Sequence, residues 1–383
     1  MPPVFDAIVI GLGGMGAATA DSLAARGRHV LGLEQFAPAH DRGSSHGRTR
    51  IIRRAYYEHP AYVPLVADSF DRWHELEQRT GRHLLTTCGC LSVGPPASEL
   101  VAGVNRSAAE HSLPVEQLTA GDIERRFPAF RIADGLAGVL EHAAGFLAVE
   151  DCVRALHTAA VANRADLRFD EPAQGWRADG QGVEVRTAHG TYRANKLVVA
   201  AGPWATHLLR DAGVPLTVMR QVQLWFRPDD PAPFRRDRFP MFMIDRPGGA
   251  FYGLPMVDPG GVKVCRHYGG AEVAHPEAVD PHVRLGDEVP VREFLRAVLP
   301  AADGPCTAAS VCRYTLTPDR HFVLDRHPAY PQVVMACGFS GHGFKFAPAV
   351  GEAMADLCDG VPRTDLAFFA AGRFSSGRGG RPV

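Results

Sequence analysis

The sequence predicts an α/β protein in which a parallel-sheet domain, assembled from separate segments, carries an inserted and mostly antiparallel sheet domain. Three observations indicate this arrangement. A strand, a glycine turn, a helix and a second strand open the chain between Val4 and Glu34, which is a βαβ pattern. From Val218 to Val264, short strands of alternating character follow one another, as in antiparallel sheets. An apolar strand, a glycine-rich turn and a helix return after Val333.

The composition is that of a globular protein and excludes several classes of function. Hydrophobic residues make up 46% and charged residues 22% of the 383 residues, and 41 basic against 42 acidic residues leave a net charge of −1. Such a chain lacks the charge asymmetry of proteins that bind nucleic acid or anionic membranes. No stretch approaches the roughly 18 apolar residues of a membrane span, and the N-terminal residues have a strand pattern instead of a signal peptide. We therefore expect a cytoplasmic protein.

The eight cysteines support the same compartment. They are scattered along the chain and lack the dense framework of small secreted domains, so we expect mostly reduced thiols. Cys88-Gly-Cys90 has no partner pair at the spacing of a metal site, and no metal is expected there.

Each element is predicted from its own periodicity and boundary residues. Strand Val4–Ile10 ends at Gly11, helix Met15–Arg26 ends at Gly27, and strand His29–Glu34 precedes a loop rich in Gly, Ser and His at Pro38–Thr49. The later elements are predicted in this order: helices Tyr62–Glu77 and Cys152–Asn163, a hairpin of Val183–Thr187 with Tyr192–Asn195, a separate strand Lys196–Ala201, helix Pro290–Leu299, strands Ser310–Thr315, His321–Leu324 and Val333–Ala336, and a helix that ends at Leu357.

These elements divide the chain into two domains and a tail. The parallel-sheet domain is predicted to comprise residues 1–83, 145–215 and 318–374. The antiparallel domain comprises residues 84–144 and 216–317, and the Gly/Arg/Ser-rich residues 375–383 are expected to be a frayed tail.

The glycine turn at the end of the first strand fits a dinucleotide-binding fingerprint. Gly11-Leu-Gly13-Gly14-Met-Gly16 matches G-x-G-x-x-G between a strand and a helix, where glycines permit the turn and the close approach of a pyrophosphate. Glu34 closes the second strand, and an acidic residue there suits an unphosphorylated ribose. The parallel-sheet domain is therefore predicted to be Rossmann-like. FAD and NAD both fit; the position at the start of the chain and the late strand that ends at Gly202 favour FAD.

Two further segments carry groups suited to anions. Four arginines fall within Arg48–Arg54, among isoleucines and after glycines, so some guanidinium groups could bind a cofactor or a carboxylate. In GFSGHGFKF, which starts at Gly338, Gly341 and Gly343 precede a lysine set between two phenylalanines.

Lysine is rare in this chain. Only three of the 41 basic residues are lysines, namely Lys196, Lys263 and Lys345. Under such a bias a lysine that remains is a candidate for a position where an ammonium is required. Lys345 has the aromatic setting just described, Lys263 lies in an alternating strand with its side chain expected to face a cavity, and Lys196 is expected at the surface.

Read together, these segments resemble the monomeric sarcosine oxidase and N-methyltryptophan oxidase family of D-amino-acid-oxidase-like flavoproteins. The resemblance extends over nearly the whole chain. It rests on the following motifs: GLGGMG at Gly11, SSHGRTRIIRRAY at Ser44, YVPLV at Tyr62, RQV at Arg220, FPMFM at Phe239, FYG at Phe251, VKVCRH at Val262, VCRYT at Val311 and GFSGHGFKF at Gly338.

The resemblance implies an FAD-dependent oxidase of secondary α-amino acids that forms an imine and reduces O2 to hydrogen peroxide. It implies a thioether bond from Cys312 to the flavin, although a lone strand cysteine is by itself an ordinary buried residue. It assigns Lys263 to the reaction with oxygen, and Arg53 and Lys345 to the substrate carboxylate. The other positions that match family site residues are Arg50 and His46 beside the flavin, and Tyr252, Met243, His267 and Tyr314 in the active-site lining.

Some positions depart from the family pattern and leave the substrate open. Ser45 replaces the first of two adjacent histidines, Arg48 replaces an aspartate, and Tyr57 replaces a glycine of the small-substrate members. A cyclic imino acid such as pipecolate or proline is the nearest alternative substrate. An NAD-dependent dehydrogenase and a flavoprotein without catalytic activity are alternatives of other classes. The expected partners are an amino acid and O2, and we expect a monomer.

Overall fold

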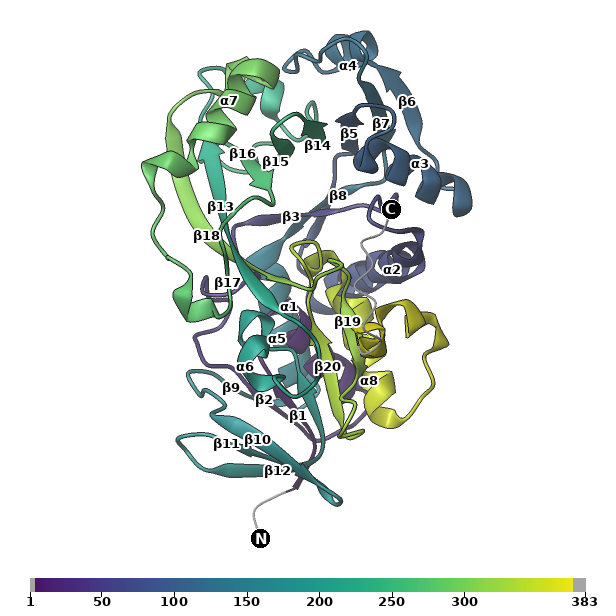
Figure 1. The fold of residues 1–383 in the computed structure, drawn as a ribbon, viewed down its shortest axis with the longest axis vertical. Coiled ribbons are helices and arrows are strands. Elements are labelled where there is room, and N and C mark those ends of the chain that lie inside the picture. Colours follow the sequence, from purple (N-terminus) through teal and green to yellow (C-terminus); the bar gives the residue numbers. More distant parts are fainter. Residues whose placement is uncertain (1–3, 375–383) are drawn as a thin grey trace.

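The computed structural model describes residues 4–374, and the predicted tail 375–383 lies outside them. Its lower part in Figure 1 is built on an eight-stranded sheet with the order β10-β11-β12-β1-β2-β9, in which β20 pairs with β12 and β19 with β20. The central strands β12, β1, β2 and β20 run parallel. The strands of this sheet are β1 Val4–Ile10, β2 Val30–Leu33, β9 Asp166–Arg168, β10 Gly175–Asp179, β11 Gly182–Arg186, β12 Thr191–Val199, β19 Val323–Arg326 and β20 Val333–Cys337.

Four helices pack together on this sheet around one apolar core. They are α1 Gly14–Ala25, α2 Val63–Thr80, α5 Val149–Ala162 and α8 Ala347–Asp359. Helix α1 is buried on almost every side, and its small residues allow close neighbours. A Cβ at Gly351 of α8 would lie 2.5 Å from the backbone of Ala18, so glycine is what lets these two helices touch.

The upper part contains a nine-stranded sheet with the order β17-β13-β16-β15-β14-β5-β7-β6, in which β18 also pairs with β13. All its pairings are antiparallel except that of β14 with β5, which confirms a mostly antiparallel sheet. The strands are β5 Cys90–Gly94, β6 Glu116–Thr119, β7 Ala137–Glu141, β13 Thr217–Phe226, β14 Met241–Arg246, β15 Gly249–Leu254, β16 Val262–His267, β17 Glu272–Val273 and β18 Cys306–Leu316.

A third, three-stranded sheet connects the two parts. Its order is β3-β8-β4, from Thr49–Ile52, Gly145–Ala148 and Leu85–Thr87, and Figure 1 shows β3 and β8 crossing between the other sheets. The remaining α-helices are α3 Glu99–Glu110, α4 Ala120–Arg126, α6 Ala205–Leu208 and α7 Val289–Val298. Short 3₁₀ helices are η1 Pro60–Tyr62, η2 Gly202–Trp204, η3 Ala232–Phe234, η4 Pro276–Ala278, η5 Leu285–Asp287, η6 Pro300–Ala302, η7 Phe344–Phe346, η8 Thr364–Phe369 and η9 Ala371–Phe374.

Most of the predicted elements are present, with two corrections. The second hairpin strand and the separate strand predicted at Lys196–Ala201 are one continuous strand, β12, because its first half pairs with β11 while its second half pairs with β20. The strand predicted at His321–Leu324 begins two residues later, at Val323, where its pairing with β20 begins. The predicted domain limits stay a prediction. Among residues 4–374, no helix is long and apolar enough to cross a membrane.

Candidate active site

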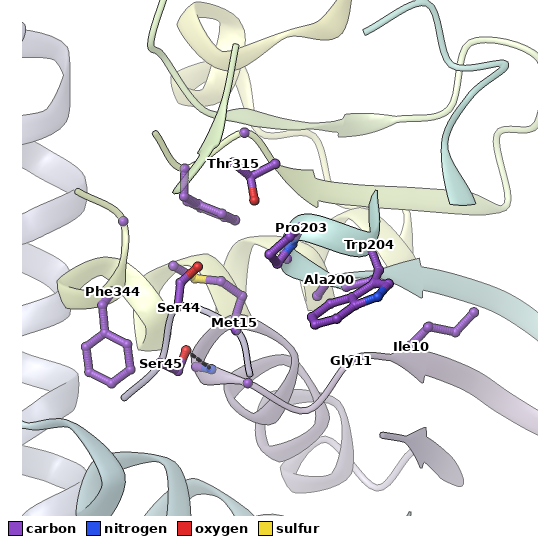
Figure 2. Close-up of a pocket in the computed structure, with 18 of the residues that line it drawn as sticks. Ile10, Gly11, Met15, Ser44, Ser45, Ala200, Pro203, Trp204, Thr315 and Phe344 are labelled. Atoms are coloured by element: carbon purple, nitrogen blue, oxygen red, sulfur yellow. Dashed lines mark hydrogen bonds between the residues drawn. The ribbon is translucent and has the colours of Figure 1, made fainter. Parts of the chain in front are cut away.

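A cavity of about 660 Å³ takes its walls from both large sheets and from the β3 segment. Figure 2 shows its nucleotide end, where Met15, Ser44 and Ser45 lie near the first turn, with Trp204 to one side and Phe344 to the other. Most of the predicted site residues line this cavity: Gly11, Gly13, Gly14, Glu34, Arg50, Arg53, Gly202, Met243, Tyr252, His267, Cys312, Tyr314, Gly341, Gly343 and Lys345. Gly16, His46 and Lys263 are not part of the lining.

The turn between β1 and α1 requires glycine at two positions, Gly11 and Gly16. Gly11 has a φ of +89°, and a Cβ there would lie 2.6 Å from the carbonyl oxygen of Ala200. A Cβ at Gly16 would lie 1.7 Å from the carbonyl oxygen of Gly11, which explains why Gly16 supports the turn from behind the cavity wall. The buried Glu34 carboxylate accepts the Leu12 N–H at 2.8 Å and so ties the second strand to this turn.

These features form a cradle that fits a dinucleotide. The first turn of a helix leaves N–H groups without intrahelical partners, and Gly13, Gly14 and Met15 at the start of α1 line the cavity. The Gly14 N–H donates to the Ser45 hydroxyl at 3.1 Å (Figure 2). The acidic Glu34 lies on the cavity wall, as expected for a residue that meets a free ribose hydroxyl pair.

Arg50 joins β3 to the strand that carries Cys312. Its guanidinium donates to the carbonyl oxygen of Ser44 at 2.7 Å and lies 3.3 Å from the Gln223 amide oxygen. The Cys312 sulfur is 3.7 Å from Arg50 Nη2. Cys312 lies on β18 opposite Gln221 of β13, is almost fully buried, and still borders the cavity.

Lys263 contacts the backbone at the start of β3, and its position differs from the one predicted from the sequence. Instead of facing the cavity, its Nζ donates to the carbonyl oxygens of Gly47 at 2.8 Å and Thr49 at 3.1 Å. The ammonium also lies 5.1 Å from the centre of the Trp225 ring. Burial, and then the charge of Arg50, lowers the pKa of Lys263 to about 7. The alternation of β16 predicted a side chain that faces a cavity, and this was wrong, because the carbonyl oxygens of Gly47 and Thr49 cover the ammonium.

Arg53 also lines the cavity and directly follows β3. Its Nη2 donates to the Glu58 carboxylate at 2.7 Å and its Nη1 to the carbonyl oxygen of Ala55 at 3.0 Å. The guanidinium stacks on the rings of Tyr56 and Tyr57, at 4.3 and 4.8 Å from their centres. Burial alone would raise the pKa of Glu58, but Arg53 and the other nearby cations bring it to about 2. Arg53 and Glu58 are therefore a fully ionised buried pair.

Lys345 is part of η7, and its ammonium and the Arg53 guanidinium both lie over the ring of Tyr56. Its Nζ donates to the carbonyl oxygen of His342 at 2.6 Å and to the Tyr56 hydroxyl at 3.2 Å, and Trp73 of α2 donates to its carbonyl oxygen. Burial, followed by the charge of Arg53, lowers the pKa of Lys345 to about 7. Arg53 is paired with Glu58, whereas among residues 4–374 the Lys345 ammonium has a carbonyl oxygen and a hydroxyl as its acceptors, so Lys345 supplies the net positive charge that a carboxylate would meet here.

Aromatic and apolar side chains complete the lining of the cavity. The rings of Tyr252 and Tyr314 lie 6.1 and 5.9 Å from the His267 ring, measured between ring centres, and Met243 lines the same cavity. His267 Nε2 is buried without a hydrogen-bond partner, and burial lowers the pKa of this side chain to about 4. Burial likewise lowers the pKa of His46 to about 3, and its side chain lies behind the cavity wall, near Ser310.

Three residues that contact Arg53 or Lys345 were not predicted from the sequence: Glu58, His342 and Tyr56. The Tyr56 hydroxyl lies 2.7 Å from His342 Nδ1, and the Glu58 carboxylate lies 3.9 Å from the same nitrogen. Glu58 could have been predicted as a partner of Arg53, because it is an acidic residue only five positions further along the chain. A tyrosine and a histidine that meet only in the folded chain leave no local pattern.

Comparison with known proteins supports one family. The model of the FAD dependent oxidoreductase family matches residues 6–357. A monomeric sarcosine oxidase of Streptomyces avermitilis is 45% identical over 362 residues, which cover 93% of this chain and 94% of that protein. An N-methyl-L-tryptophan oxidase of Yersinia pestis is 35% identical over 373 residues, which cover 97% of this chain and 99% of that protein.

A solved structure shows the same fold. NikD, described as an unusual amino acid oxidase essential for nikkomycin biosynthesis, superposes with a TM-score of 0.85 at 28% identity. The superposition covers 96% of this chain and 97% of that chain, so it includes both large sheets and the segment between them.

Proposed function

This chain belongs, with monomeric sarcosine oxidases and N-methyltryptophan oxidases, to the FAD-dependent oxidoreductase family, and on that premise we propose that it oxidises secondary α-amino acids with O2. The favoured substrates are sarcosine and other N-methyl amino acids. One observation carries the proposal: a single cavity is lined both by the dinucleotide cradle and by the buried cations Arg53 and Lys345.

The residues present fit FAD. Gly11, Gly13 and Glu34 would hold its adenosine and pyrophosphate part, and Cys312 would form a thioether bond with it, close to the Arg50 guanidinium. When bound, FAD supplies a two-electron acceptor and the site at which O2 is reduced. The protein supplies binding, orientation and charge.

Arg53 and Lys345 would bind the substrate carboxylate through charge-assisted hydrogen bonds. Fixing the carboxylate orients the C–H bond next to the amine, and orientation supplies much of the rate. The amine must be neutral for an imine to form, because an ammonium has no lone pair. Glu58 offsets the charge of Arg53, so the Lys345 ammonium is the group that disfavours a second ammonium in this cavity and so favours the reactive form of the amine.

Lys263 would stabilise negative charge that develops when oxygen is reduced. Its ammonium is anchored on two carbonyl oxygens, so the charge is held in a fixed position and needs no rearrangement during the reaction. For an N-methyl substrate, one O2 and one water are consumed, and formaldehyde, the primary amino acid and H2O2 are produced.

A peroxide-coupled screen of N-methyl and cyclic amino acids tests the proposal. Purified holoenzyme is expected to release one H2O2 per substrate oxidised, together with formaldehyde when the substrate is N-methylated. Peroxide without formaldehyde, and only with pipecolate or proline, would assign the cyclic alternative. Absence of oxygen uptake with every amino acid in the screen would refute an oxidase.

A further inference from the structure

Among residues 4–374, strand β3 pairs with one other strand and lies between two cationic sites: the carbonyl oxygen of its first residue, Thr49, accepts from Lys263, and Arg53 directly follows its last residue. It pairs with β8, from Thr49 opposite Ala148 to Ile52 opposite Gly145. The sequence places a glutamate on each side of β8: Glu141 is the last residue of β7, and Glu150 lies in the first turn of α5. Each glutamate reaches one end of β3, and neither side chain lines the cavity.

Glu141 holds the segment that follows β3. Its buried carboxylate accepts the Arg54 N–H at 2.8 Å and the Ala55 N–H at 2.9 Å. The carbonyl oxygen of Ala55 in turn accepts a hydrogen bond from Arg53 Nη1 at 3.0 Å. A continuous series of hydrogen bonds therefore runs from the Glu141 carboxylate, through one short piece of backbone, to the Arg53 guanidinium.

Glu150 holds the segment that precedes β3 in the same way. Its carboxylate accepts the Gly47 N–H at 2.7 Å and the Arg48 N–H at 3.1 Å. The carbonyl oxygens of Gly47 and Thr49 are the two acceptors of the Lys263 ammonium. Gly47 and Arg48 both have left-handed backbone, with φ of +95° and +66°, and Arg48 adopts it at a steric cost. The Glu150 carboxylate fixes this unfavourable backbone and so fixes the carbonyls that anchor Lys263.

We propose that Glu141 and Glu150 are positioning residues with separate tasks: Glu141 aligns Arg53 for the substrate carboxylate, and Glu150 aligns the anchor of Lys263 for the reaction with oxygen. This inference rests on the proposed function, since it assumes what the two cations do. Two N–H donors converge on each carboxylate, and in each case a single oxygen lies within reach of both: Glu141 Oε2 at 3.1 and 2.9 Å, and Glu150 Oε1 at 2.7 and 3.2 Å. A glutamine could keep these contacts but would lose the negative charge, which makes such hydrogen bonds about twice as strong as neutral ones.

The test compares Glu141→Gln and Glu150→Gln holoenzymes in two measurements that need no turnover. The first is the dissociation constant of methoxyacetate, which has an ether oxygen in place of the amine of sarcosine, followed by flavin absorbance. The second is the rate at which O2 reoxidises flavin that has been reduced chemically. Glu116→Gln is the matched control, because that glutamate pairs at the surface with Arg126 and His142.

The two variants are expected to show opposite patterns. Glu141→Gln should weaken methoxyacetate binding by about tenfold or more and leave the oxygen rate within about twofold of the wild type. Glu150→Gln should lower the oxygen rate by about tenfold and leave methoxyacetate binding within about twofold. Equal losses of both properties in each variant, or no loss in either, would overturn the separate tasks.

A folding defect is separated from positioning by a second pair of variants. Glu141→Asp and Glu150→Asp keep the charge on a shorter side chain, and each is expected to recover part of the property that its Gln variant lost. Loss of folding in both the Gln and the Asp variants would overturn the proposal in favour of a purely structural role. The proposed function has its own test, because it fails if the wild type releases no peroxide with any amino acid. The oxygen measurement on Glu150→Gln uses chemically reduced flavin and no amino acid, so its outcome is independent of that test.

Discussion

The protonation of Lys345 should set the affinity of the site for carboxylates. Its pKa is lowered to about 7 by burial and by the neighbouring Arg53. A lysine whose pKa is lowered loses its charge as pH rises through that value. Only the ammonium form attracts a carboxylate strongly, so the affinity should be high below pH 7 and fall above it.

The size of the effect follows from the pKa. With a pKa near 7, about nine-tenths of Lys345 is charged at pH 6 and about one-tenth at pH 8, so carboxylate affinity should fall by about tenfold over this interval. The other titratable groups near Lys345 do not change charge there: the pKa values are about 2 for Glu58, about 3 for His342 and about 4 for His267. Arg53 stays charged throughout.

Titration of the holoenzyme with methoxyacetate between pH 5.5 and 9 measures this dependence through flavin absorbance. Lys345→Met should bind more weakly and lose the pH dependence, whereas Lys345→Arg should lose the pH dependence because its charge is permanent. Lys263→Met is the control, since Lys263 has a similar pKa but lies against the carbonyls of the β3 segment. A wild-type affinity that is constant from pH 6 to 8, or a dependence that persists in Lys345→Met, would refute the reasoning.

Three other predictions concern the flavin. Lys263→Met should slow the reaction of reduced flavin with O2 by about a hundredfold, measured by stopped flow, and Lys263→Arg should not restore it. Cys312→Ala should release all its flavin into the supernatant on acid precipitation, whereas the wild-type precipitate should remain yellow; a colourless wild-type precipitate would exclude the thioether. Gly16→Ala, whose Cβ would meet the backbone of Gly11 at 1.7 Å, should lower the flavin-to-protein absorbance ratio of the purified protein, and an unchanged ratio would contradict the cradle.

The parts of the fold that depend on neighbouring residues were predictable from the sequence. The glycines of the first turn and the small residues of α1 impose their conformations locally, and the structure shows the predicted strand, turn, helix and strand. The change to short alternating strands near Val218 likewise identified the second sheet. The continuity of β12 was not predictable. Its first half pairs with β11 and has the pattern of a hairpin strand, whereas its second half pairs with β20 and has the pattern of a buried strand, so the sequence reads as two strands.

The sequence predicted which residues belong to the candidate site, but not which residues they contact. The motifs of the family resemblance named Arg53, Cys312 and Lys345, and the structure places all three on one cavity. The supporting glutamates Glu141 and Glu150 were missed. They bind backbone N–H groups, which every residue except proline possesses, so their partners leave no trace in the sequence.

The three lysines show what the sequence determines by itself and what only the tertiary structure decides. By itself the sequence determined that an arginine-rich chain keeps three lysines, and the surroundings of Lys263 and Lys345 in it drew attention to these two. Only the tertiary structure decided that both ammonium groups are buried beside arginines, that their pKa values fall to about 7, and that one lies on the cavity while the other is anchored behind it. The physical reason is that backbone conformation follows from adjacent residues, whereas desolvation and charge come from groups distant in the chain that only folding brings together.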